Sequence, residues 1–130
     1  ALEFYGKNLG LTFQIADDTL DYNSDLKFFG KKVGKDFLEG KITLPIILLF
    51  QNITHIEKDK LKDIFKQETR SDSDLKFTLE LIKKYNIINE CYKKAEHFIN
   101  LASNSLTVFK DSDEKKILEK LTSFSLERTF

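Results

Sequence analysis

Residues 9–22 of the chain read LGLTFQIADDTLDY, and this stretch decides the fold class. Its apolar side chains recur every three or four positions, which is the period of an α-helix. We therefore predict a first helix over residues 2–22. Its apolar positions are Leu2, Tyr5, Leu9, Phe13, Ala16 and Leu20. Leu11 and Ile15 widen this stripe, so we expect the helix to be buried on most of its sides.

The rest of the chain also favours helices. Residues 23–42 are rich in glycine and lysine and are predicted to form a polar loop. A short apolar helix follows, with Thr43 at its N-cap and Pro45 in its first turn. Further packing helices are predicted within residues 43–130, over residues 57–67, 72–85, 88–108 and 112–128. Because the period-two alternation of a strand is never sustained, the predicted class is all-α.

The last predicted helix has a start signal and an apolar face. Asp111 and Glu114 stand three residues apart, which resembles a capping box. The face that we expect to pack carries Ile117, Leu118, Leu121 and Phe124.

Composition excludes several classes of protein. The 130 residues carry 21 Lys and Arg against 21 Asp and Glu, so no global charge recruits nucleic acid. The single cysteine excludes an internal disulfide. The longest uncharged apolar stretch, residues 42–54, is shorter than the roughly 20 residues of a membrane span. We expect a soluble, cytoplasmic protein, and because no methionine is present we expect part of a longer one.

Three carboxylates crowd the end of the first predicted helix. Asp17 and Asp21 are one turn apart on the same face, and Asp18 is displaced by about 100°. Like charges at this spacing repel each other, and a hard divalent cation would relieve the repulsion. With oxygen ligands and neither His nor Cys nearby, the chemistry favours Mg²⁺. The alternative is a solvated acidic face with no ligand.

A lysine-rich loop follows the carboxylates, and residues 30–45 read GKKVGKDFLEGKITLP. Lys31, Lys35 and Lys41 lie in a segment jointed by glycines, and each directly follows one. Lysines beside bound Mg²⁺ suit a diphosphate, which needs several positive charges. The alternative is a flexible, solvated lysine loop. A nucleotide-binding P-loop is excluded because the glycine spacing is one residue short and no strand precedes it.

Together these two stretches resemble the trans-isoprenyl (polyprenyl) diphosphate synthase family. Residues 9–22 look like its second aspartate-rich helix, and the stretch to Pro45 is similar to its G-K-x-x-G-x-D-x-x-x-G-K-x-T-L-P loop without a gap. The match covers residues 6–48, and the sequence of this segment is nearest to those of octaprenyl-like long-chain synthases. The resemblance implies the C-terminal part of an isoprenoid-synthase helical bundle, with residues 1–130 forming one fragment of a single polyprenyl synthetase domain.

The resemblance also implies the roles of individual residues. Asp17, Asp18 and Asp21 would bind Mg²⁺, with Asp17 as the most direct ligand, whereas Asp36 would order the loop.

The substrate would be contacted by four further side chains. Gln14 would lie beside the allylic substrate, and Phe13 would help to wall its pocket. Lys31 and Lys41 would contact the allylic diphosphate and stabilise it as it departs. Lys35 occupies a variable position of the family motif, so we expect no role for it.

The implied enzyme condenses isopentenyl diphosphate with an allylic diphosphate to give a polyprenyl diphosphate. The first aspartate-rich motif of the family is missing, so we expect the N-terminal half to lie elsewhere and this chain alone to be inactive. The intact protein is expected to be a homodimer that touches membranes at most peripherally, through its lipid product. A non-catalytic partner subunit is the alternative, and a terpene cyclase is disfavoured by the lysine loop. The length of the product cannot be predicted from these residues.

Overall fold

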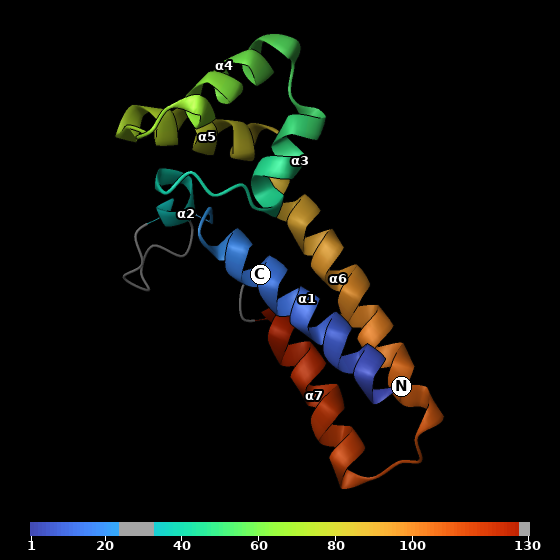
Figure 1. Ribbon diagram of the computed structural model, residues 1–130. Helices are drawn as coiled ribbons and strands as arrows, with labels where there is room; N and C mark the ends of the chain where they lie inside the picture. The colour runs from blue at the N-terminus through green and yellow to red at the C-terminus, as the bar shows by residue number, and fades with distance from the viewer. Residues whose placement is uncertain (24–32, 128–130) are drawn as a thin grey trace. The chain divides into compact units, whose positions relative to one another are not determined.

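The computed structural model describes residues 1–23 and 33–127, and all regular structure in these ranges is helical (Figure 1). The elements are α1 (Leu2–Leu20), α2 (Lys35–Leu38), α3 (Leu44–Asn52), α4 (His55–Lys66), α5 (Asp72–Lys84), α6 (Ile87–Ser105), a 3₁₀ turn η2 (Leu106–Val108) and α7 (Asp113–Glu127). The predicted all-α class is therefore confirmed. The predicted loop is wrong in one respect, because its described part contains the short helix α2.

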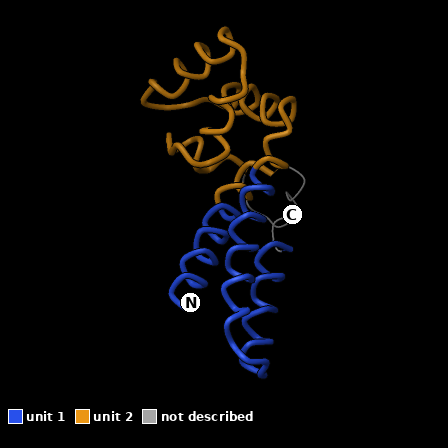
Figure 2. Tube along the Cα trace, turned by 90° about the vertical axis from the view of Figure 1, so that its right-hand side faces the viewer, with its two compact units in different colours: residues 1–17, 91–130 blue, residues 18–90 orange. Residues whose placement is uncertain are grey.

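The chain divides into two compact units (Figure 2). The first unit combines residues 1–17 with residues 91–130, and the second consists of residues 18–90. Helices α1 and α6 each cross a boundary between the units.

Three helices form the first unit, and hydroxyl groups join them. The Tyr5 hydroxyl of α1 donates to the carbonyl of Leu118 in α7 at 2.6 Å. The buried Thr12 hydroxyl donates within α1 to Asn8 at 3.0 Å, and it lies 3.5 Å from the carbonyl of Ala95 in α6. Ser103 and Thr122 link α6 to α7 at 3.4 Å. A small apolar core of Tyr5, Ala102 and Leu106, with Leu9 and Leu118 against it, fills the space between these helices.

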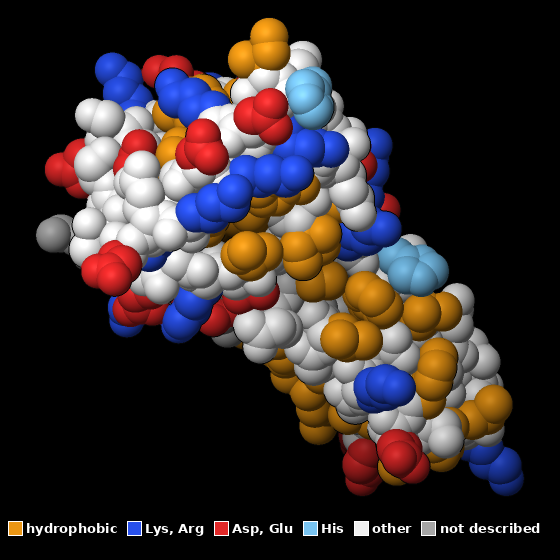
Figure 3. Space-filling view, turned by 45° about the horizontal axis from the view of Figure 1, so that its top comes forward, with side chains coloured by type: hydrophobic (Ala, Val, Ile, Leu, Met, Phe, Trp, Pro, Cys, Tyr) orange, Lys and Arg blue, Asp and Glu red, His pale blue; other side chains and the backbone are white. Residues whose placement is uncertain are grey.

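The predicted packing face of α7 is wrong for three of its four residues, whereas Leu118 packs against the core. Ile117, Leu121 and Phe124 lie at positions i, i+4 and i+7 and are 59%, 38% and 56% exposed. The buried side chains of α7 include Thr122 and Ser125 instead. The helix therefore turns its apolar stripe outward, and Figure 3 shows hydrophobic side chains at the surface of the first unit.

The predicted burial of α1 on most sides is also wrong in the described structure. Leu2, Phe4 and Leu11 are exposed, while Tyr5 and Ala16 are buried. Within its unit, α1 contacts α7 through Tyr5 and approaches α6 through Thr12.

The second unit has a conventional apolar core. Phe37, Ile46, Leu49 and Leu61 are completely buried. The Phe37 ring of α2 meets the Phe65 ring of α4 edge to face, with 5.4 Å between their centroids. The core thus connects the short helix α2 to the helices that follow it.

Side chains fix the helix starts of the second unit. Thr54 and Glu57 form a capping box at α4, and Ser71 and Asp74 form another at α5. The box at Thr54 explains why α4 begins at His55, two residues earlier than predicted.

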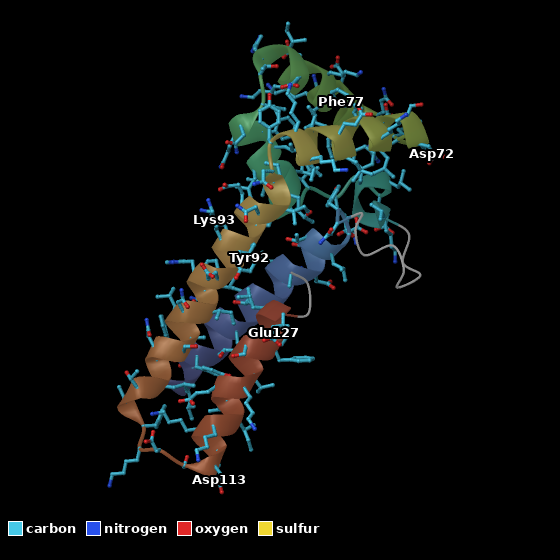
Figure 4. All side chains as sticks on the ribbon, turned by 180° about the vertical axis from the view of Figure 1, so that it is seen from behind. Asp72, Phe77, Tyr92, Lys93, Asp113 and Glu127 are labelled. Carbon is cyan, nitrogen blue, oxygen red and sulfur yellow. The ribbon has the colours of Figure 1, made fainter. Side chains whose placement is uncertain are left out.

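Two further caps differ in detail from prediction. Thr43 is the N-cap of α3 and Pro45 lies in its first turn, as predicted, but the Thr43 side chain makes no capping hydrogen bond. At α7 the capping oxygen belongs to Ser112, which accepts the N–H of Lys115 at 3.1 Å. Asp111 pairs with the Lys115 ammonium instead, at 3.3 Å. Asp113 and Glu127 mark the two ends of this helix in Figure 4.

Within residues 1–23 and 33–127, no helix combines the length and the apolar character needed to cross a membrane.

Candidate functional site

The carboxylates lie at the end of α1. Asp17 and Asp18 are in the last turn of this helix, and Asp21 follows it in a turn. The helix ends two residues earlier than predicted, and the carbonyl of Asp21 accepts the N–H of Gly34 at 2.8 Å. The C-terminal end of a helix carries partial negative charge, and no basic residue occupies the last turn of α1. Three acidic side chains at this end are therefore unfavourable without a cation.

Asp21 caps α2 from a distant position in the sequence. The N-cap residue of α2, Gly34, has no side chain that could accept the free N–H groups of the first turn. Asp21 accepts them instead: Oδ1 lies 3.0 Å from the Lys35 nitrogen, and Oδ2 lies 2.9 Å from the Asp36 nitrogen. The carboxylate thus ties the start of α2 to the end of α1.

The potential around Asp21 is negative. Burial raises the pKa of Asp21, and the Asp36 and Glu39 charges raise it further, against the opposing effect of the two backbone N–H bonds. Burial also raises the pKa of the neighbouring Tyr22 phenol, as do the carboxylates of Asp21, Asp36 and Asp18. Asp36 and Glu39 thus add negative potential at the Asp21 carboxylate, and this favours a cation beside it.

Lys41 stands at the other end of α2. Its ammonium lies 3.1 Å from a Glu39 oxygen and 3.9 Å from an Asp36 oxygen. The hydrogen bond and the charge of Glu39 raise the pKa of Lys41, so the group stays protonated. Because the side chain is 61% exposed, its ammonium can exchange a carboxylate partner for another anion.

The remaining predicted residues are assigned to the first unit or are not among the described residues. Phe13 is half-buried and Gln14 is exposed, and both belong to the part of α1 in the first unit, as does Asp17. Lys31 lies outside the described residues. The structure therefore brings together Asp21 and the turn that carries Lys41.

The sequence prediction missed Glu39 and the capping role of Asp21. The capping contact joins residues 14 and 15 positions apart, and no local pattern in the sequence signals it.

The oxygen donors fit Mg²⁺ in their chemistry. Across the described parts of the chain, no three or more His, Cys, Asp and Glu side chains are grouped as a metal ion would need. Mg²⁺ typically takes one or two carboxylates and completes its shell with water and phosphates, so such a group is not required. Asp21 also keeps spare lone pairs, because a carboxylate offers about four acceptor sites and two are used here.

The described helices and the acidic end of α1 agree with a match to a known family. The family model described as "Polyprenyl synthetase" matches residues 1–82. The chain therefore belongs to the polyprenyl synthetase family.

Relatives cover almost the whole chain. A short chain isoprenyl diphosphate synthase from Methanocaldococcus jannaschii is 36% identical over 130 residues, which are 100% of this chain and 39% of the relative. A polyprenyl synthase from Caulobacter crescentus, solved with calcium and isoprenyl diphosphate, superposes with a TM-score of 0.85 at 32% identity. That alignment covers 97% of this chain and 38% of the other. An octaprenyl pyrophosphate synthase from Helicobacter pylori gives a TM-score of 0.82 at 36% identity, covering 95% and 39%.

The chain spans about 39% of the length of the short-chain relatives that it matches. The relatives include both short-chain isoprenyl and solanesyl diphosphate synthases. Similarity in this region therefore does not separate classes of product length, and the predicted nearness to octaprenyl-like enzymes stays a prediction.

Proposed function

We propose that this chain is the part of a prenyltransferase that binds the diphosphate of an allylic substrate, with Mg²⁺ held by Asp17, Asp18 and Asp21. One observation carries the proposal: Asp21 caps α2 and so ties the turn with Lys41 to the acidic end of α1. A structural neighbour that was solved with calcium and isoprenyl diphosphate supports it.

The metal ion and two lysines would neutralise the negative charge of the diphosphate. Bound Mg²⁺ would supply a Lewis acid that neutralises charge on the diphosphate. Lys41 would release Glu39 and donate to a diphosphate oxygen as the carbon–oxygen bond of the allylic substrate breaks. Lys31 would add a second positive charge.

The apolar part of the substrate needs an apolar surface that excludes water and a polar group that orients it. Phe13 would supply the wall and Gln14 the orienting amide. With water excluded, the allylic carbon forms a carbon–carbon bond to isopentenyl diphosphate, and loss of a proton restores a double bond. The intact enzyme would release a polyprenyl diphosphate, and we propose that it acts as a homodimer in the cytoplasm.

Calorimetric titration of the 130-residue chain with inorganic diphosphate tests the binding part of this proposal. We expect binding that requires Mg²⁺. Lys41→Ala should weaken it about tenfold or more, because a charge-assisted hydrogen bond is lost. Lys35→Ala removes the same charge from the opposite end of α2 and should change affinity by no more than about twofold. Equal effects of the two substitutions would contradict the role of Lys41.

The same titration addresses the alternative function. A folded chain with no Mg²⁺-dependent binding would favour a non-catalytic partner subunit of a heteromeric synthase. Binding that is as tight without Mg²⁺ would overturn the metal assignment but leave an anion site at Lys41.

A further inference from the structure

Both ends of α2 are covered by one segment of the second unit, residues 70–75. Gly34 and Gly40 bound α2 with positive φ angles of 88° and 76°. A Cβ atom added to Gly34 would lie 2.5 Å from Cδ1 of Leu75, and one added to Gly40 would lie 2.7 Å from Nη2 of Arg70. The side chains of Leu75 and Arg70 therefore rest directly on the two glycines.

Arg70 joins two helix ends through its guanidinium group. Nη1 donates to the carbonyl of Gln67 at 2.8 Å, after the end of α4. Nη2 makes long hydrogen bonds of 3.4 Å to the carbonyls of Leu38, the last residue of α2, and of Glu68. Carbonyls at helix ends lack partners within the helix, and a cation there is favourable. The group acts as a bridge between α4 and the end of α2.

The bridge lies beside the turn that carries Lys41. In this turn the N–H of Gly40 donates to Phe37 and the N–H of Lys41 donates to Asp36, both at 2.9 Å. Asp21 holds the first amides of α2, and Arg70 contacts the last carbonyl and the glycine after it. Helix α2 is therefore anchored at both ends, by Asp21 at its start and by Arg70 beside the turn at its end.

We propose that Arg70 is a positioning residue, which holds the turn at residues 38–41 so that Lys41 can meet a diphosphate. This inference rests on the proposed function, in which Lys41 binds that group. Arginine suits the role because its planar fork reaches several carbonyls at once, whereas lysine is a single point charge. The α5 capping box at Ser71 fixes the backbone next to Arg70, which keeps the segment in place.

Hydrogen exchange followed by mass spectrometry tests the positioning without any ligand. In Arg70→Ala we expect exchange in a peptide covering residues 38–42 to become about tenfold faster, as expected for losing hydrogen bonds to a charged group. Peptides from α4 and α5 and the overall helicity should stay as in the wild type. Lys76→Ala removes an exposed positive charge one residue after Leu75 and should leave all peptides unchanged.

Calorimetric titration with inorganic diphosphate and Mg²⁺ tests whether the anchoring by Arg70 affects diphosphate binding. We expect Arg70→Ala to weaken binding several-fold while Lys76→Ala does not, and Arg70→Lys should restore little of the loss. Unchanged exchange and unchanged affinity in Arg70→Ala would overturn the proposal, and so would faster exchange spread evenly over the second unit. If Arg70→Ala fails to fold, hydrogen exchange and calorimetric titration of Arg70→Lys test the proposal in its place. If exchange accelerates locally but the wild type binds no diphosphate, the anchoring of the turn stands and the proposed function falls.

Discussion

The two units of this chain solve the problem of burying apolar surface in different ways. The second unit closes its core on itself, with completely buried side chains from α2, α3 and α4 and a capping box at the starts of both α4 and α5. The first unit joins its helices through hydroxyl groups and a small core. Of twelve exposed large apolar side chains among the described residues, eight lie in the first unit.

The difference shows where local signals suffice to specify structure. In the second unit, charged and aromatic groups of neighbouring helices also meet: the Lys60 ammonium of α4 lies 4.0 Å from the centroid of the Phe77 ring of α5 (Figure 4). The lysine turn is anchored by contacts within the second unit. We expect the second unit to be sensitive to substitutions that the first unit tolerates.

The largest expected difference between the two units is the loss of stability when a large apolar side chain is truncated. Leu61 is completely buried in α4, and Leu61→Ala should cost roughly 2–5 kcal/mol of unfolding free energy. Phe124 is 56% exposed in α7, and Phe124→Ala should cost less than about 0.5 kcal/mol although it removes more atoms. Urea denaturation followed by circular dichroism measures both. Equal losses would show that the apolar stripe of α7 is covered in solution.

Replacing glycine by alanine should give opposite signs in the two units. Gly34 has a φ of 88° and Leu75 against it, so Gly34→Ala should destabilise the chain by about 1–2 kcal/mol or more. Gly10 lies within α1, and a Cβ atom added to it would meet no described residue of another element within 4 Å, so Gly10→Ala should stabilise the chain by about 0.5–1 kcal/mol. Thermal unfolding of the two variants checks the signs. A loss of stability in Gly10→Ala would mean that another backbone approaches this face.

Acid should weaken a link that belongs to the second unit alone. Hydrogen bonds from Lys84 and Tyr85, and from the backbone N–H of Thr54, lower the pKa of Glu57 from 4.5 to about 2. Because the folded value is below the unfolded one, the stabilisation is complete above pH 4.5 and is lost as the pH falls toward 2. Glu57→Gln should remove this part of the acid dependence, measured as urea midpoints between these pH values. A variant with the wild-type slope would show that Glu57 is not the group responsible.

The all-α fold class and most of the helices could be predicted from the sequence, because the repeat of apolar residues that indicates a helix is a local pattern. The sequence also contains the signal for the start of α4, since Thr54 and Glu57 have the spacing of a capping box. The outward stripe of α7 could not be predicted, because an apolar pattern does not say which side a neighbour covers. The cap of α2 by Asp21 could not be predicted either, since it joins residues 14 and 15 positions apart.

The candidate site followed from residue types more than from geometry. Asp17, Asp18, Asp21 and Lys41 were named from their spacing and from a family resemblance. The residue types that indicate metal and diphosphate binding stand close together in the sequence. The anchoring by Arg70 depends instead on tertiary contacts from a segment more than 25 residues further along the chain.

Turnover of a synthase that contains this chain tests the central claim most directly. Asp17→Ala should reduce the rate of condensation of isopentenyl diphosphate with farnesyl diphosphate by orders of magnitude and weaken its dependence on Mg²⁺. Asp63→Ala removes an exposed carboxylate from α4 and should leave both unchanged. Near-normal turnover with an unaltered Mg²⁺ titration in Asp17→Ala would contradict the claim that the acidic end of α1 binds the metal ion.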